Sequence, residues 1–247
     1  MTDYLLASDL DGTLLGDDAG LDAFAAWHKQ HASDVHLVYA TGRFFEAVKQ
    51  IVAETALPAP EAVIGGVGSD IRRFPSGDYV QEWHEKISVD WDPAKACRVL
   101  ESIPQVEMQP DDCQSDYKVS GYLYDAEQTQ LDDLKQRLES AGIRAHIIYS
   151  SQRDLDILPG QANKGTAVEF YAGMLNIPTD RVVVCGDSGN DLALYQHGFR
   201  GIVVGNAHPE LKTLSDANVY HATRPMAAGV VEGLKYWLDG DAAGSRA

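Results

Sequence analysis

Tyr4-Leu5-Leu6-Ala7-Ser8-Asp9-Leu10-Asp11-Gly12-Thr13 is the stretch that decides the fold. Its apolar run, Tyr4 to Ala7, ends in a polar pair, which is typical of a buried strand that delivers its last side chains to a sheet edge. Asp9 and Asp11 stand at alternate positions, so both side chains point the same way if the chain is still extended. One carboxylate can then attack a substrate while the other moves protons. Taken alone, the pair fits a helix cap and turn equally well.

The segments that follow this strand repeat its pattern. Val35 to Ala40 is a second apolar run, ending at Thr41-Gly42, and Ala62 to Ile64 is a third that leads into Gly65-Gly66-Val67-Gly68. Apolar residues recur at helical spacing in the two intervening segments: Leu21, Phe24, Ala25 and His28 in the first, and Phe45, Val48, Ile51 and Val52 in the second. Strands that alternate with helices predict a parallel sheet.

The composition changes between Tyr79 and about Pro159, where aromatic and polar segments replace the alternating pattern. We expect a small α+β insertion there. Its expected helices are Pro93 to Ser102 and Ala126 to Ala141, and its expected strands lie near Lys118 to Tyr124 and Ala145 to Ser150. The parallel pattern then returns with a helix from Lys164 to Leu175, the strand Val182 to Cys185, a helix from Asp191 to His197, the strand Gly201 to Val204, and a final helix from Gly229 to Leu238 before a polar tail.

Charge and composition exclude several classes of partner. The 247 residues contain 20 Lys plus Arg and 37 Asp plus Glu, a net charge of −17, which repels nucleic-acid phosphates and anionic lipid, so we expect no nucleic-acid and no membrane partner. A phosphorylated substrate then needs local positive charge from a metal ion or a few placed Lys and Arg side chains. The short apolar run at Tyr4 to Ala7 and the lack of a long apolar stretch lead us to expect no export and no membrane span. Three widely spaced cysteines, without a paired motif, favour a cytoplasmic location.

Further polar residues follow the predicted strands, at the edge where open parallel sheets bind ligands. Gly186-Asp187-Ser188-Gly189-Asn190-Asp191 offers Asp187 as a Mg²⁺ ligand, with Asp191 supporting it. Lys164 opens a helix, where backbone N–H groups already favour an anion, and Thr41-Gly42-Arg43 places a hydroxyl and N–H groups at another helix start. Each signal alone also fits a loop, a cap or a solvated lysine.

Together, these four segments resemble the four motifs of the haloacid dehalogenase superfamily of phosphatases. Within it the chain is similar to sucrose-phosphate phosphatases and to mannosylfructose-phosphate phosphatases over nearly its whole length. The similar stretches are Tyr39 to Arg43, Lys118-Val119-Ser120, Ser150 to Pro159 and Val203 to Ala207. The resemblance implies a Rossmann-like α/β core domain of residues 1–81 and 160–247, with an inserted α+β cap domain of residues 82–159 that sets substrate specificity.

The resemblance also implies roles for individual residues. Asp9 is the expected nucleophile and Asp11 the proton donor and acceptor, with Thr41 and Lys164 completing the catalytic set. Mg²⁺ is expected on the Asp9 and Asp187 carboxylates and the Asp11 backbone carbonyl, steadied by Asn190 and Asp191. Thr41, Gly42 and Lys164 are expected to bind phosphate. The expected sugar contacts of the cap are Lys118, Ser120, Gln152, Arg153 and Asp154.

The expected reaction is Mg²⁺-dependent hydrolysis of a phosphorylated disaccharide, foremost sucrose 6-phosphate. Gly12 stands where sucrose-phosphate phosphatases often carry Asn, and Ile64 to Gly68 is more similar to the mannosylfructose-phosphate relatives, so their substrate is the alternative. A phosphotransferase or phosphomutase that uses the same aspartyl-phosphate is a further alternative. A sugar-phosphate sensor without catalysis is a third, which the presence of all the catalytic residues argues against. We expect a monomer, functionally coupled to a sugar-phosphate synthase.

Overall fold

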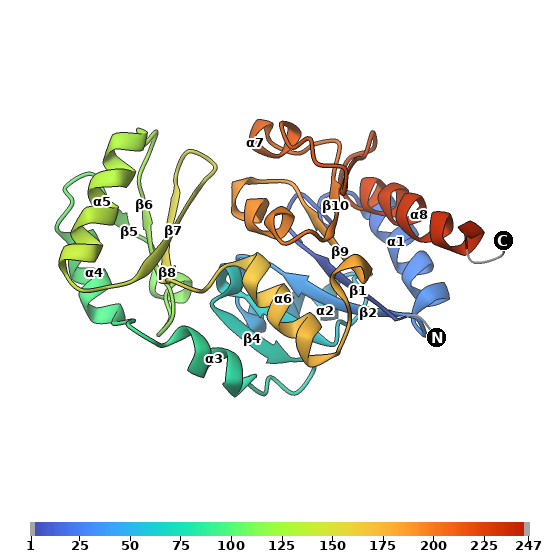
Figure 1. Ribbon diagram of the computed structural model, residues 1–247, viewed down its shortest axis with the longest axis horizontal. Helices are drawn as coiled ribbons and strands as arrows, with labels where there is room; N and C mark the ends of the chain where they lie inside the picture. The colour runs from blue at the N-terminus through green and yellow to red at the C-terminus, as the bar shows by residue number, and fades with distance from the viewer. Residues whose placement is uncertain (1–2, 245–247) are drawn as a thin grey trace.

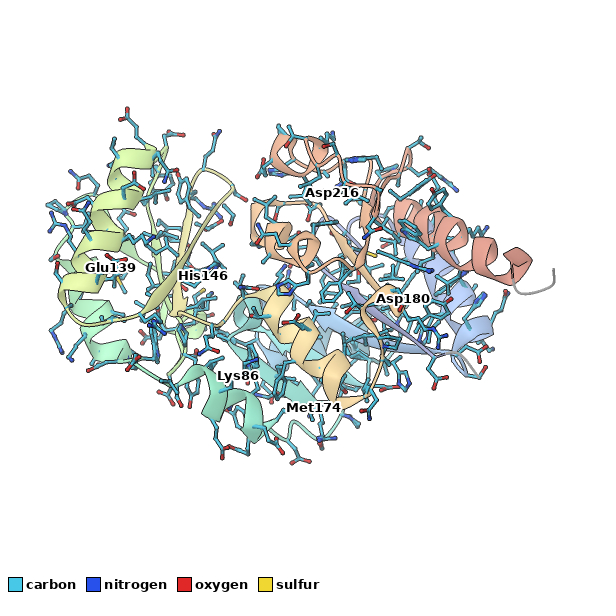
Figure 2. The ribbon with its side chains drawn as sticks, in the orientation of Figure 1. Lys86, Glu139, His146, Met174, Asp180 and Asp216 are labelled. Carbon is cyan, nitrogen blue, oxygen red and sulfur yellow. The ribbon has the colours of Figure 1, made fainter. Side chains whose placement is uncertain are left out.

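Two α/β bodies lie side by side in the molecule, and both chain ends belong to the larger one (Figure 1). The computed structural model describes residues 3–244, and of the side chains those of residues 3–238. Figure 2 marks the bodies by labelled side chains, with Glu139 and His146 on the smaller one and Asp180 and Asp216 on the larger one. Among the helices of residues 3–244, none combines the length and the apolarity needed to cross a membrane.

The larger body contains a seven-stranded sheet in the order β11-β10-β9-β1-β2-β3-β4. Its strands are β1 (Tyr4–Ser8), β2 (Val35–Ala40), β3 (Ala62–Gly65), β4 (Asp70–Arg73), β9 (Val182–Gly186), β10 (Arg200–Val203) and β11 (Val219–His221). All neighbours are parallel except β3 and β4. The chain leaves β1 towards β2 on one side and β9 towards β10 on the other, so the carboxyl end of β1 lies at the switch point where such sheets form a ligand crevice.

The apolar runs of the sequence account for this sheet. Leu5, Leu6 and Ala7 of β1 are at most 1% exposed, as expected for a parallel strand covered on both faces. Helix α1 (Asp18–His31) begins where the Asp17 side chain accepts the Gly20 N–H, and its apolar side packs with α8 (Met226–Gly244). The remaining helices are α2 (Phe45–Glu54), α6 (Lys164–Met174) and α7 (Pro209–Lys212), with 3₁₀ turns η1 (Gly66–Gly68), η3 (Thr179–Arg181) and η4 (Gly189–Gln196).

The smaller body, which we call the insertion and which runs from α4 to β8, has its own antiparallel sheet in the order β5-β6-β8-β7. Its elements are α4 (Pro93–Glu101), β5 (Glu107–Met108), η2 (Asp111–Cys113), β6 (Val119–Tyr122), α5 (Gln128–Ser140), β7 (Ala145–Ser150) and β8 (Asp154–Pro159). Leu100, Leu134 and Ile157 are among the side chains of a hydrophobic cluster separate from that of the larger body. Helix α3 (Gln81–Ile87), which carries Lys86 in Figure 2, leads into it.

The predicted fold class, a parallel α/β core with an inserted α+β body, is confirmed. Six helices and strands were missed: β4, α3, β5, β8, α7 and β11. The expected α-helix from Asp191 to His197 is wrong in type, because the segment is the 3₁₀ helix η4. The last helix is longer than expected at both ends and continues to Gly244. The domain boundaries stay a prediction; Trp83, just beyond residue 82, packs in the larger cluster.

Candidate active site

A buried lysine and a buried aspartate meet at the carboxyl end of β1. Lys164, at the first position of α6, is 0% exposed, and its Nζ donates to Asp9 Oδ1 at 2.8 Å. The same ammonium donates to Asn190 Oδ1 at 2.8 Å and to Asp191 Oδ1 at 2.7 Å. Its three N–H groups therefore all have protein acceptors, and they fix the position of the Asp9 carboxylate. The expected contact of Lys164 with phosphate stays a prediction.

A glycine turn positions this lysine. Gly68 has φ +98°, and a Cβ there would overlap the Asn163 carbonyl immediately before Lys164. Its own carbonyl accepts the Trp83 indole N–H at 3.1 Å. The Asn163 side chain caps α6 by accepting the Thr166 N–H at 2.9 Å. Close approach of the turn and the cap together determine where α6 begins, and so where Lys164 enters the site.

Three buried carboxylates, those of Asp9, Asp187 and Asp191, have oxygen atoms within 4.8 Å of one another. Both oxygens of Asp191 already accept hydrogen bonds: Oδ1 from Lys164, and Oδ2 from the backbone N–H groups of Asp187 and Ser188 at 3.0 and 3.1 Å. Asp187 Oδ1 accepts the Thr13 hydroxyl at 3.2 Å. Three carboxylates against one ammonium leave an excess of buried negative charge, and oxygen donors are the ligands of hard divalent cations. The cluster can bind such a metal ion, with Asp9 and Asp187 offering the freer oxygens.

Burial and crowding shift the pKa values in this cluster. Burial raises the pKa of Asp9 to about 8, which Lys164 opposes and Asp191 reinforces. Burial also raises the pKa of Asp187 to about 6, again reinforced by Asp191. For Lys164, burial would lower the pKa, but the carboxylates of Asp191 and Asp9 outweigh it and raise the value. The lysine therefore stays charged, and a further positive charge beside the carboxylates would lower their pKa values.

Asp11 and the segment after β2 form the other side of the site. The Asp11 carboxylate is not part of the acidic cluster; it accepts two hydrogen bonds from Arg43 at 2.7 Å each. Metal binding by its backbone carbonyl stays a prediction. Thr41 is fully buried and its Oγ1 accepts the Arg43 N–H at 3.2 Å, whereas Gly42 lines the adjacent cavity. Motif residues expected in one crevice are thus brought together from β1, β2, α6 and β9.

A cavity of about 770 Å³ extends from this site to the insertion. Of the five sugar contacts expected there, Lys118, Arg153 and Asp154 line it. Ser120 does not: it is buried, and its hydroxyl donates to Asp156 Oδ1 at 2.6 Å. Gln152 also lies outside the lining, on the exposed turn between β7 and β8. Their direct contact with a sugar remains a prediction.

The sequence reasoning did not single out several residues that line the cavity. The lining includes Phe44, Gln109, Cys113, Tyr122, Asp156 and His208. Asp156 forms an ion pair with Lys118 at 3.1 Å, and the Lys118 ammonium lies 5.5 Å from the centre of the Phe44 ring, so it joins the insertion to the larger body. The alternation Asp154-Leu155-Asp156 is typical of a strand and would have indicated two acidic side chains on one face.

The structure combines a largely parallel α/β sheet, a lysine-bound aspartate directly after the first strand, and an inserted α+β body. This combination defines a phosphatase of the haloacid dehalogenase superfamily. The chain belongs to the sucrose-6F-phosphate phosphohydrolase family, whose model matches residues 2–238. Members of this class are phosphoric monoester hydrolases.

Three relatives set the context. The chain is 38% identical to the mannosylfructose-phosphate phosphatase of Agrobacterium fabrum, over 94% of this chain and 96% of that protein. It is similar to the sucrose-phosphatase of Synechocystis sp. PCC6803, solved in complex with sucrose and phosphate, with a TM-score of 0.90, 31% identity and coverage of 96% and 98%. It is also 31% identical to a glucosylglycerol-phosphate synthase of Pseudomonas anguilliseptica, over 94% of this chain but 30% of that longer protein.

Proposed function

We propose that this protein hydrolyses a phosphorylated disaccharide, foremost sucrose 6-phosphate, through an aspartyl-phosphate on Asp9. The observation that carries the proposal is the buried Asp9 carboxylate, bound by Lys164 at 2.8 Å and lining a cavity that extends to the insertion. Burial keeps water from solvating the nucleophile, and the lysine orients it. A carboxylate held in this way can attack phosphorus in line with the leaving sugar oxygen.

The size and lining of the cavity support a disaccharide substrate. Its volume of about 770 Å³ lies in the range of roughly 300–1,000 Å³ for pockets that enclose drug-sized ligands. Lys118, Asp154 and Asp156 supply charged donors and acceptors on the insertion side, which suit sugar hydroxyl groups. The family model and the Synechocystis structure favour sucrose 6-phosphate, while the relative from Agrobacterium makes mannosylfructose phosphate the alternative.

The reaction proceeds in two displacements. In the first, an Asp9 oxygen bonds to phosphorus and the bond between phosphorus and the sugar oxygen breaks. The sugar oxygen keeps the electron pair of the broken bond and accepts a proton from Asp11. In the second, water attacks the aspartyl-phosphate, Asp11 accepts the water proton, and the Asp9 carboxylate and inorganic phosphate are released. Gly42 offers a backbone N–H to the phosphoryl oxygens, and Thr41 holds the turn that presents it.

The metal in this proposal is Mg²⁺, which the Asp9 and Asp187 carboxylates and the Asp11 carbonyl would hold. When bound, it supplies the positive charge that lets a strongly acidic protein accept a phosphate dianion. Asn190 and Asp191 support this side of the site by their hydrogen bonds to Lys164.

The test is release of inorganic phosphate from sucrose 6-phosphate, mannosylfructose phosphate and simple hexose phosphates, each with Mg²⁺ and with EDTA. We expect Mg²⁺-dependent release that is fastest with a disaccharide phosphate. Transfer of phosphate to a second sugar without release would instead indicate the phosphotransferase alternative. Absence of both reactions with every sugar phosphate would refute the proposal.

We further propose that a sugar-phosphate synthase supplies the substrate. The support is that a protein named as a glucosylglycerol-phosphate synthase contains a segment similar to nearly all of this chain. A cytoplasmic location is consistent with the thiols of Cys97, Cys113 and Cys185, which are all free. Co-purification of the protein with the synthase activity from its source cells tests the coupling.

A further inference from the structure

The motif after β2 contains a side chain to which the proposed reaction gives no role. Arg43 Nε donates to Asp11 Oδ2 and Arg43 Nη2 donates to Asp11 Oδ1, both at 2.7 Å. Two parallel charge-assisted hydrogen bonds fix both the distance and the plane of a carboxylate, which a single point charge cannot do. Arg43 therefore determines which way the Asp11 carboxylate faces.

The Asp11 side chain needs such a partner because it is 55% exposed. Among the described residues, Arg43 is the partner to which the structure assigns its carboxylate hydrogen bonds. An exposed aspartate without a fixed partner samples several rotamers, and general acid catalysis requires the proton donor within hydrogen-bond reach of the leaving oxygen. Disorder of Asp11 would lower the rate without removing the group itself.

The backbone of Arg43 is held firmly enough to serve as an anchor. Its N–H donates to Thr41 Oγ1 at 3.2 Å, and its carbonyl accepts the Gly66 N–H at 3.1 Å. A Cβ at Gly65 would lie 2.9 Å from that same carbonyl oxygen, so the glycine permits the close approach of the two loops. Thus the loop after β3 fixes Arg43, and Arg43 fixes a residue that follows β1.

We propose that Arg43 is a positioning residue that orients Asp11 for proton transfer to the leaving sugar oxygen. The proposal rests on the proposed function, in which Asp11 donates the proton as the bond between phosphorus and oxygen breaks. Arg43 acts through Asp11 and makes no bond to the reacting phosphorus. Removal of the Arg43 side chain should therefore lower kcat/KM most for substrates whose leaving group must be protonated.

Two substrates separate this role from a contact with phosphate. A sugar alkoxide is a poor leaving group that must be protonated, whereas p-nitrophenolate is stable as it leaves. The quantity to measure is kcat/KM, because it reports the steps up to departure of the leaving group and excludes hydrolysis of the aspartyl-phosphate. Since general acid–base help is worth roughly 10²- to 10⁴-fold in all, we expect Arg43→Ala to lower kcat/KM for sucrose 6-phosphate by about 10- to 100-fold, and for p-nitrophenyl phosphate by less than about threefold.

Matched variants complete the experiment. Arg43→Lys should recover part of the loss, since an ammonium makes one of the two bonds. Arg43→Ala in an Asp11→Asn background should cause no further loss of kcat/KM, because the group that it orients no longer donates a proton. Arg137→Ala is the control: Arg137 binds Asp133 at 2.7 Å on α5, with an exposure similar to that of the Arg43 pair, and should leave both substrates unaffected. Exposed ion pairs contribute little to stability, so all these variants should fold.

An equal loss of kcat/KM on the two substrates would overturn the proposal and indicate a contact with the phosphoryl group. A further loss in the Asp11→Asn background would do the same. If the wild type cleaves p-nitrophenyl phosphate but no phosphorylated sugar, the proposed function fails by itself, and glycerol 2-phosphate, also an alkoxide ester, then decides the role of Arg43. No turnover of any phosphate ester would overturn both.

Discussion

Replacement of Lys164 by methionine tests the electrostatic basis of the site most directly. The methionine fills the space of the lysine stem but cannot donate the hydrogen bonds to Asp9, Asn190 and Asp191, which are 2.7–2.8 Å long in the structure. Because Lys164 is fully buried, water does not reach the position of its ammonium and cannot stabilise the carboxylates in its place. The variant leaves a cluster of buried carboxylates without its internal counterion.

The size of the effect follows from the burial. Removing one partner of a buried ion pair costs about 3–5 kcal/mol of unfolding free energy, because the remaining charge is uncompensated. For a chain of 247 residues each kcal/mol shifts Tm by roughly 2–4 °C, so the expected loss is roughly 6–20 °C. Bound Mg²⁺ should restore part of this loss, since it supplies the missing positive charge at the same carboxylates.

The pH dependence has a definite sign. The pKa of Asp9 is raised from 3.8 to about 8 in the folded protein, so its folded form binds the proton more tightly than its unfolded form, and stability falls as pH rises between these values. Lys164 lowers the pKa of Asp9, so its removal raises that pKa further. The difference in Tm between wild type and Lys164→Met should therefore be larger at pH 8 than at pH 5.5.

The assay is thermal unfolding followed by circular dichroism in EDTA and in Mg²⁺, at both pH values. Lys164→Met/Asp191→Asn is the matched variant: it removes one of the stranded charges while keeping a side-chain oxygen, and it should recover part of the stability. A Tm for Lys164→Met within about 2 °C of the wild type in EDTA at pH 8, which corresponds to under about 1 kcal/mol, would refute the reasoning.

Three further predictions concern the nucleophile, the metal and the glycine turn. Asp9→Asn should reduce phosphate release to background while its Tm in EDTA at pH 7 equals or exceeds that of the wild type, because burial disfavours the charged carboxylate; normal kcat would contradict this. The rise in Tm caused by Mg²⁺ should be larger at pH 8.5 than at pH 6, since Asp187 and Asp9, with pKa values of about 6 and 8, must lose protons to bind the metal; an equal rise would contradict it. Gly68→Ala should lower both Tm and kcat, and should reduce the free energy of unfolding by more than about 1 kcal/mol, because the added Cβ meets the backbone beside Lys164 at a positive φ. Gly142→Ala, at an open turn with φ +74°, is the control for the backbone strain alone.

The elements that were predicted well are those in which local pattern and tertiary burial agree. β1, β2, β3 and β9 are short apolar runs, and each is buried in the sheet as expected. Three of the missed strands, β4, β5 and β8, contain charged residues, and the fourth, β11, is only three residues long. β4 reads Asp70-Ile71-Arg72-Arg73 and is the last strand at one edge of the sheet, where charged side chains are tolerated. β5 has two residues, too few for any periodicity.

The candidate site shows the same division. Asp9, Lys164, Asp187 and Asp191 were predicted from the rule that residues after parallel strands converge, and the structure brings all four together. The bond from Arg43 to Asp11 could not be predicted, because 32 residues separate them and its geometry depends on two loops. The same holds for Asp156 on β8, whose partner Lys118 lies immediately before β6, the strand that pairs with β8.

The sequence by itself determined the alternation of strands and helices, the place of the insertion and the motif residues at the strand ends, because hydrophobic period and chain order are local properties. The tertiary structure decided which charges compensate one another: Lys164 with three acceptors, Arg43 with Asp11, and Lys118 with Asp156. Electrostatic energies depend on distances between atoms and on exclusion of water, and both arise when distant segments pack together. The electrostatic environment of Asp9 is therefore a property of the folded chain.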